Sequence, residues 1–111
     1  MSFQIYYVDD EIELCEIFVD EFSTKDYEIT AFHDPQSAIA ACEKKAPDLI
    51  FIDYRMPGMN GDKLAQRLSP DIKKILITGE IQVDVEAKFE TILGKPIMNK
   101  LVRDQLAKYL K

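Results

Sequence analysis

The sequence predicts an α/β fold, a doubly wound sheet of five parallel strands with helices on both faces. Short apolar runs alternate with amphipathic stretches along the chain, which is the pattern of repeated β-α units. The 111 residues match the size of one domain. Parallel strands joined by right-handed crossovers carry helices on both faces only if the strand order reverses, and the common five-stranded order is 2-1-3-4-5.

The first half of the chain predicts two strands and two helices in alternation. Phe3–Val8 is an apolar run typical of a strand, and the amphipathic stretch Glu11–Phe22 predicts a helix. Tyr27–Phe32 alternates between apolar and polar residues and predicts the second strand. Asp34 followed by Pro35 is a strong helix start, and that helix should end before the next proline.

The second half continues the alternation. Asp48–Asp53 is nearly all apolar and predicts a central strand buried on both faces. A short helix is expected from about Gly61 to Leu68. Lys73–Thr78 and Glu90–Leu93 predict the remaining strands, and a last helix is expected from about Met98 to Leu110.

The stretch Gly79–Phe89, between the last two strands, has a weak helical pattern. Its apolar residues Ile81, Val83 and Val85 alternate with polar ones, and β-branched residues are poor helix formers. We therefore expect a short or distorted fourth helix at this position.

Composition excludes several classes of protein. The net charge is −6 and no segment concentrates Lys or Arg, so direct nucleic-acid binding is not expected. No apolar run approaches the roughly 18 residues of a membrane span, and the first residues do not resemble a signal peptide. We expect a cytoplasmic protein without membrane insertion. Cys15 and Cys42 fall within apolar helical patterns, which indicates structural thiols.

Acidic residues follow two of the predicted strands, and a lysine follows another. Asp9 and Asp10 come after the first strand, Asp53 ends the third, and Lys95 comes just after the fifth. The strand order reverses between the first and third strands, and ligands bind at such a point of an open α/β sheet. Three carboxylates there would repel one another by up to about 4 kcal/mol per close pair at an effective dielectric of about 20. A hard cation such as Mg²⁺, together with Lys95, would offset this repulsion.

Simpler interpretations exist for single residues. Asp9 or Asp10 could cap the helix that follows, and Lys95 could be a solvated surface residue. Tyr6 and Tyr7 are most simply explained as strand residues. None of these interpretations accounts for all the charged positions together.

Four segments resemble the receiver domain of two-component response regulators, the CheY-like family with a flavodoxin-like fold. They are the acidic pair in "VDD" at 8–10, "FIDYRMPGMNG" at 51–61, Thr78 at the end of the fourth strand, and "KP" at 95–96. Each segment is weak alone, but all four in order at strand ends form a specific signal. The resemblance implies a single receiver domain over residues 1–111. It also implies a phosphoacceptor switch of a phosphorelay, not a multiple-turnover enzyme.

The resemblance gives each matching residue a role. Asp53 would take a phosphoryl group from the phosphohistidine of a sensor histidine kinase or histidine phosphotransfer domain. Thr78 and Lys95 would bind the phosphoryl oxygens. The implied ligands of Mg²⁺, or of Mn²⁺, are the carboxylates of Asp9, Asp10 and Asp53 and the backbone carbonyl of Arg55. Supporting roles are implied for Pro57 and Gly61 in the loop after the acceptor, Gly79 beside the threonine, and Pro96 after a cis peptide bond.

Two positions depart from the family pattern. Members usually carry Tyr or Phe three residues before the lysine, where this chain has Ile92, and Phe89 is a candidate substitute. The interval from Thr78 to Lys95 is also shorter than usual. Both departures affect the output surface, so a degenerate receiver that acts only as an interaction module is the alternative function. The downstream protein or linked effector domain is not specified by the sequence.

Other functions of this fold fit less well. Asp-based phosphatases place a second Asp two residues after the nucleophile, and Arg55 occupies that position after Asp53. A flavin-binding module would need a phosphate-binding loop after the first strand, where this chain has the acidic sequence "DDEIEL". Arg55 and Glu80 occupy variable positions that flank the acceptor in the family. Our hypothesis is that these two side chains lie together and gate the access of water.

Overall fold

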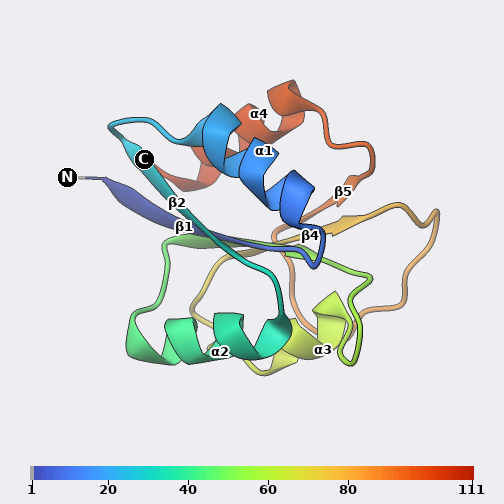
Figure 1. The fold of residues 1–111 in the computed structure, drawn as a ribbon. Coiled ribbons are helices and arrows are strands. Elements are labelled where there is room, and N and C mark those ends of the chain that lie inside the picture. Colours follow the sequence, from blue (N-terminus) through green and yellow to red (C-terminus); the bar gives the residue numbers. More distant parts are fainter. Residues whose placement is uncertain (1) are drawn as a thin grey trace.

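An all-parallel sheet of five strands forms the centre of the computed structural model, in the order β2-β1-β3-β4-β5 (Figure 1). The structure describes residues 2–111, so Met1, the first residue of the predicted domain, lies outside the description. The strands are β1 (Phe3–Val8), β2 (Tyr27–Phe32), β3 (Leu49–Asp53), β4 (Lys74–Thr78) and β5 (Thr91–Gly94). The predicted fold class and strand order are confirmed.

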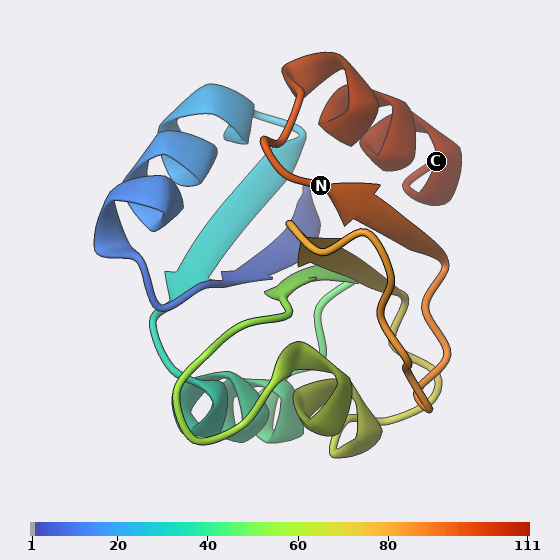
Figure 2. The same cartoon turned by 90° about the vertical axis from the view of Figure 1, so that its right-hand side faces the viewer.

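Within the described residues, four helices cover the two faces of the sheet (Figures 1 and 2). They are α1 (Ile12–Phe22), α2 (Pro35–Lys44), α3 (Gly61–Gln66) and α4 (Asn99–Tyr109). Helices α1 and α4 lie on one face, and α2 and α3 lie on the other. Asp34 caps α2 as predicted, because its carboxylate accepts a hydrogen bond from the Ser37 backbone N–H at 2.8 Å.

Alternation along the strands builds two cores, one on each face of the sheet. Every residue of β3 is buried, as its apolar run predicts. Phe51 points toward α1 and α4, whereas its neighbours Ile50 and Ile52 point toward α2 and α3. The same alternation divides β1, where Tyr7 lies in the first core and Tyr6 in the second. Consecutive residues of one strand therefore serve opposite sides of the molecule.

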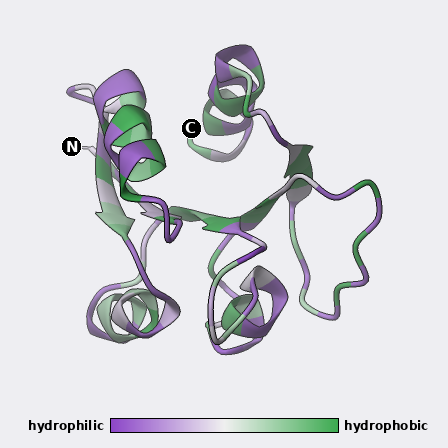
Figure 3. Ribbon diagram, turned by 45° about the vertical axis from the view of Figure 1, so that its right-hand side comes forward, coloured by the Kyte–Doolittle hydropathy of each residue, from purple (hydrophilic) through white to green (hydrophobic). Residues whose placement is uncertain are grey.

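Residues 79–90, between β4 and β5, form no helix, which corrects the expectation of a short or distorted one. The segment runs at one side of the sheet without regular structure (Figure 3). Val83, Val85, Ala87 and Phe89 are partly buried against the core on the α2–α3 face, and the residues between them are exposed. A period of two suits an extended chain and would spread these apolar side chains around a helix.

The carboxylate of Asp62, on α3, holds this extended segment. It accepts hydrogen bonds from the backbone N–H groups of Glu86 at 3.0 Å and Ala87 at 2.8 Å. The side-chain amide of Gln66 donates a third bond at 3.0 Å, and Asp62 is only 5% exposed. Backbone N–H groups outside regular structure need acceptors from elsewhere. Asp62 therefore supplies part of the bonding that a helix would have provided internally.

Replacing Asp62 with Ala should lower the free energy of unfolding by about 1–3 kcal/mol, because two backbone donors lose their acceptor. Urea unfolding followed by circular dichroism measures this change. Asp84→Ala removes an exposed carboxylate from the same segment and should change the free energy by less than about 0.5 kcal/mol. An unaltered stability of Asp62→Ala would show that this carboxylate does not anchor the segment.

Candidate functional site

Asp53, the last residue of β3, forms an ion pair with Lys95 at the carboxyl edge of the sheet. Asp53 is 2% exposed, and the Lys95 ammonium lies 2.8 Å from its Oδ1 atom. Lys95 follows β5, which lies two places from β3 in the sheet. The peptide bond between Lys95 and Pro96 is cis, as the resemblance implied. The predicted meeting of Asp53 and Lys95 is therefore confirmed.

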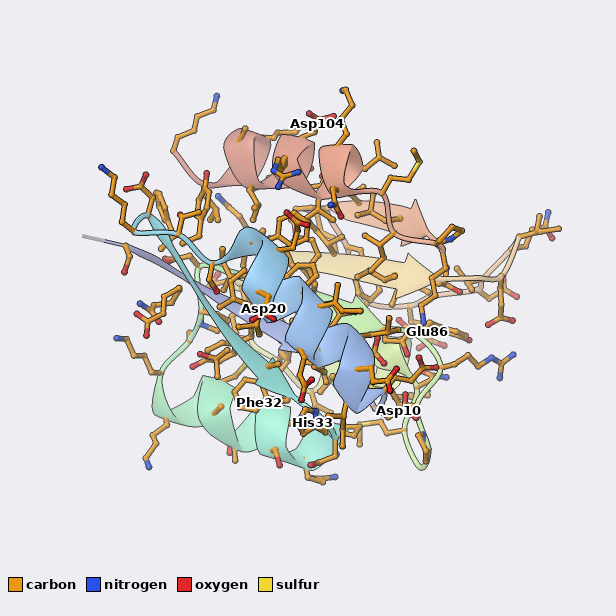
Figure 4. The ribbon with its side chains drawn as sticks, turned by 45° about the horizontal axis from the view of Figure 1, so that its top comes forward. Asp10, Asp20, Phe32, His33, Glu86 and Asp104 are labelled. Carbon is orange, nitrogen blue, oxygen red and sulfur yellow. The ribbon has the colours of Figure 1, made fainter. Side chains whose placement is uncertain are left out.

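Two more carboxylates share this edge. Asp9 is buried at the end of β1, and Asp10 is exposed beside the first turn of α1 (Figure 4). One oxygen from each of Asp9, Asp10 and Asp53 lies within 4.8 Å of the other two. The donors are all carboxylate oxygens and one of them faces water, which fits a hard cation that keeps part of its hydration shell. The residues present thus fit a magnesium site.

Both oxygens of Asp9 are already hydrogen-bonded. Oδ1 accepts from the backbone N–H of Glu11 at 2.9 Å, and Oδ2 accepts from the hydroxyl of Tyr7 at 2.9 Å. Helix α1 has Glu11 at its N-cap position and no side-chain cap. The interpretation of Asp9 or Asp10 as a cap of α1 is therefore wrong. The contact from Tyr7 was not predicted.

Burial and the charge pattern shift the pKa values of the central ion pair. Burial raises the pKa of Asp53 to about 6, the hydrogen bond from Lys95 works against this shift, and the charge of Asp9 adds to it. Burial alone would lower the pKa of Lys95, but the hydrogen bond and charge of Asp53 outweigh it and raise that pKa. Lys95 therefore stays cationic, while Asp53 is held in a site that disfavours its ionised form.

Thr78 ends β4 and is buried beside this pair. Its carbonyl accepts a hydrogen bond from the Lys95 backbone N–H at 3.0 Å, and its hydroxyl oxygen accepts from the Glu80 N–H at 3.1 Å. A threonine hydroxyl that accepts one hydrogen bond can still donate its own proton. A Cβ added at Gly79 would lie 3.8 Å from the Cβ of Lys95, which is an ordinary contact, so packing alone does not require glycine at this position.

The loop after Asp53 depends on two glycines for different reasons. Gly58, after Pro57, has a φ of 81°, a conformation that side chains rarely adopt. At Gly61 a Cβ would lie 2.6 Å from the carbonyl oxygen of Asp53, so only glycine lets α3 begin against β3. This close approach is the structural reason for glycine at position 61.

Arg55 and Glu80 form a bidentate salt bridge between the loops that follow β3 and β4. Two guanidinium nitrogens of Arg55 donate to the two carboxylate oxygens of Glu80 at 2.9 and 3.0 Å. The guanidinium also lies 5.6 Å from the centre of the Tyr54 ring. The predicted proximity of the two side chains is confirmed, and their effect on water access stays a prediction.

Ile92, at the position where the family usually has an aromatic residue, and its candidate substitute Phe89 lie in different surroundings. Ile92 is 46% exposed on the edge strand β5, and Phe89 is partly buried against the α2–α3 side.

Both cysteines are buried and free. Burial, with the nearby charge of Asp9, raises the pKa of Cys15 to about 11, and burial raises that of Cys42 to about 11. Protonated buried thiols agree with the expected structural role.

Comparison with protein families decides the assignment. The model of the response regulator receiver domain matches residues 5–108. The chain belongs to this family. Receiver domains are the phosphorylatable switches of two-component systems, they pair with histidine kinases and effector domains, and they typically bind Mg²⁺. The acidic cluster of this receiver is thus of the kind that its family uses.

Curated relatives differ widely in length. The cyclic di-GMP phosphodiesterase response regulator RpfG of Xanthomonas campestris pv. campestris is 39% identical over 90 residues, which cover 72% of this chain and 24% of RpfG. Sporulation initiation phosphotransferase F of Bacillus subtilis is 28% identical over 118 residues, covering 99% of this chain and 95% of that protein. This receiver therefore spans about a quarter of the first relative but nearly the whole of the second.

Solved structures support the fold. The receiver domain of a putative LuxO repressor from Vibrio parahaemolyticus superimposes with a TM-score of 0.89 at 22% identity, covering 99% of this chain and 91% of that one. The chemotaxis protein CheY4 of Vibrio cholerae superimposes with a TM-score of 0.85 at 22% identity, and the match covers 99% of this chain and 100% of CheY4. Within residues 2–111, none of the helices has the length and apolar character needed to cross a membrane.

The raised pKa of Asp53 predicts a pH-dependent stability of the metal-free protein. Protonation of the buried carboxyl favours the folded state below the unfolded pKa of about 4, and this contribution is lost as the pH rises through about 6. Asp53→Asn cannot ionise, so its free energy of unfolding should rise relative to the parent by about 1 kcal/mol between pH 5 and 8 in EDTA. Urea unfolding at several pH values measures the difference.

Asp34→Asn is the matched control, because hydrogen bonds from Ser37 lower the pKa of this exposed residue and keep it ionised throughout that range. The difference in the free energy of unfolding between Asp34→Asn and the parent should stay constant between pH 5 and 8. A constant difference for Asp53→Asn as well would contradict a costly buried charge at Asp53.

Proposed function

We propose that this receiver is a cytoplasmic phosphorylation switch whose acceptor is Asp53. The donor would be the phosphohistidine of a sensor histidine kinase or a histidine phosphotransfer domain. The observation that carries the proposal is the buried Asp53 carboxylate, paired with Lys95 at 2.8 Å and within 4.8 Å of two further carboxylates. A structural ion pair needs only one carboxylate, and the like charges of Asp9 and Asp10 add a repulsive energy at Asp53.

The metal would be Mg²⁺, with Mn²⁺ as a substitute. The residues that would hold it are Asp9, Asp10, Asp53 and the backbone carbonyl of Arg55. When bound, the cation would neutralise negative charge on the transferring phosphoryl group. The support for this proposal is the all-oxygen donor set, of which only the Asp10 carboxylate is exposed.

The residues of the chain would carry out the transfer itself. An oxygen of Asp53 attacks the phosphorus and forms an acyl phosphate, while the bond from phosphorus to the donor imidazole breaks and its electron pair returns to the nitrogen. Lys95 pairs with the phosphoryl oxygens as a charged donor. Thr78 turns its hydroxyl toward the same group, beside Gly79, which carries no side chain. The product stays attached to Asp53, so the domain acts as a switch and not as a multiple-turnover enzyme.

Phosphorylation would change the balance between two conformations. The modification adds about −1.5 to −2 charges at Asp53. If Thr78 moves toward this group, its hydroxyl loses the bond from the Glu80 N–H, which belongs to the extended segment 79–90. The segment and β5 would then adopt the altered arrangement more often, which is a population shift.

Intact-mass measurement tests the acceptor. After incubation with acetyl phosphate and Mg²⁺, the parent should gain about 80 Da, the mass of one phosphoryl group, and Asp53→Ala should not. Asp84→Ala, which loses an exposed carboxylate elsewhere, should gain the same mass as the parent. No gain in the parent, or an equal gain in Asp53→Ala, would exclude Asp53 as the acceptor.

The degenerate receiver is the second candidate, because Ile92 is exposed at the usual aromatic position and residues 79–90 lack a helix. Beryllofluoride with Mg²⁺ separates the two functions by NMR. A working switch shows saturable, Asp53-dependent shifts that extend through 79–90 to β5. In a degenerate receiver, the shifts stay within the residues around Asp53.

Breaking the Arg55–Glu80 salt bridge should shorten the lifetime of the phosphorylated form. Arg55→Ala or Glu80→Ala opens the crevice to water, and we expect hydrolysis to accelerate by about threefold or more. The double variant should match the single ones, because either change removes the same contact. Phosphate release from purified phosphoprotein measures the rate.

The control for this test is Lys100→Ala, which breaks the exposed salt bridge with Asp104 on α4. It should leave the phosphoprotein lifetime unchanged. Parental lifetimes in Arg55→Ala and Glu80→Ala would end the hypothesis of a water gate.

A further inference from the structure

Tyr7 lies on β1, two residues before Asp9, and its hydroxyl reaches the Asp9 carboxylate. Residues i and i+2 of a strand point to the same face, so the two side chains share one side of the sheet. The Tyr7 hydroxyl donates to Asp9 Oδ2 at 2.9 Å, and both residues are buried. This contact therefore links the apolar core on the α1–α4 face to the cluster of carboxylates.

The ring of Tyr7 is held by other aromatic side chains. It stacks on Phe18 of α1 with ring centres 4.1 Å apart and planes inclined by 14°. Phe18 in turn packs against Phe51 of β3 at 5.1 Å and against Phe22 at 4.8 Å. Since both the strand and the helix fix the ring, the position of its hydroxyl is set by the fold and not by Asp9.

The two donors to Asp9 restrict how this carboxylate can bind a cation. The Glu11 N–H occupies a lone pair of Oδ1, and the Tyr7 hydroxyl occupies one of Oδ2. A carboxylate has about four lone-pair sites, so each oxygen keeps one. Asp9 cannot rotate to offer both oxygens to one ion without losing a hydrogen bond. It can present one oxygen, in a fixed direction, to a metal or to a water on that metal.

We propose that Tyr7 is a positioning residue of the metal site, one that aims the Asp9 carboxylate and spreads part of its negative charge onto a neutral donor. This role rests on the proposed binding of Mg²⁺ by Asp9, Asp10 and Asp53. Partners that hydrogen-bond to metal ligands typically change metal affinity by about 10–100-fold when they are removed. Under this proposal, Tyr7 is a strand residue of β1 that also supports the metal site.

Tyr6 provides an internal comparison. It is the neighbouring residue on β1 and points to the opposite face, where its hydroxyl donates to the Lys45 carbonyl at 2.8 Å. It packs edge-on against Phe32 with ring centres 4.9 Å apart. Tyr6 thus has a hydroxyl donor bond and an aromatic partner like Tyr7, but its partner is a backbone group remote from the carboxylates.

The test compares Tyr7→Phe with Tyr6→Phe by calorimetric titration with Mg²⁺ alone. Tyr7→Phe keeps the stacked ring, and its Mg²⁺ dissociation constant should rise about tenfold. Tyr6→Phe should stay within about twofold of the parent, although both variants lose one hydroxyl hydrogen bond. Affinity for Mn²⁺, followed by electron paramagnetic resonance, should change in the same way. An unaltered affinity in Tyr7→Phe, or an equal loss in both variants, would overturn the role of Tyr7.

A measurement on the parent protein needs no substitution. The hydroxyl proton of buried Tyr7 should give an NMR signal that shifts on Mg²⁺ addition, while that of Tyr6 stays in place. A Tyr7 hydroxyl signal unmoved by saturating Mg²⁺ would contradict the proposal. If the parent binds no Mg²⁺, then the metal site itself fails, which is a different result from parental affinity in Tyr7→Phe.

Discussion

The close packing of three carboxylates at one edge of the sheet is the constraint on which the rest of the site depends. Asp9, Asp10 and Asp53 lie within 4.8 Å of one another, and two of them are buried. Each close pair costs up to about 4 kcal/mol at an effective dielectric of about 20. Lys95 offsets part of this energy through its contact with Asp53, and hydrogen-bond donors stabilise Asp9. The remaining repulsion is what a bound cation would relieve, which couples metal binding to the stability of the fold.

Topology explains why so much of the site could be predicted from the sequence. The strand order follows from β-α alternation, and it places the ends of β1 and β3 together wherever the side chains point. Hydrogen bonds of single side chains could not be predicted this way, because they depend on rotamers and on packing neighbours. Tyr7 carried a readable signal, its i and i+2 relation to Asp9 on one strand. Asp62 carried none, because its partners lie 24 and 25 residues further along the chain.

The segment 79–90 shows how local pattern and architecture can conflict. A β-α-β crossover favours a helix at this position, whereas the alternating apolar residues favour an extended chain. The structure follows the local pattern, since extension buries the alternating residues against the α2–α3 core and Asp62 satisfies two backbone donors. The segment is joined to Thr78 through the Glu80 N–H and to the loop after β3 through Arg55. Thr78 and Arg55, which lie close to Asp53 in the fold or in the chain, are therefore in direct contact with this extended segment.

The central claim is that the three carboxylates form one cation site beside the acceptor. A crystal structure with Mn²⁺ and beryllofluoride, located by anomalous scattering, tests it most directly. The account predicts one Mn²⁺ at about 2.1 Å from oxygens of Asp10 and Asp53, with Asp9 bound directly or through water and beryllofluoride on Asp53 facing Lys95. The account would be contradicted by a structure in which Mn²⁺ binds elsewhere, beryllofluoride is absent from Asp53, and the ion pair between Asp53 and Lys95 is unaltered.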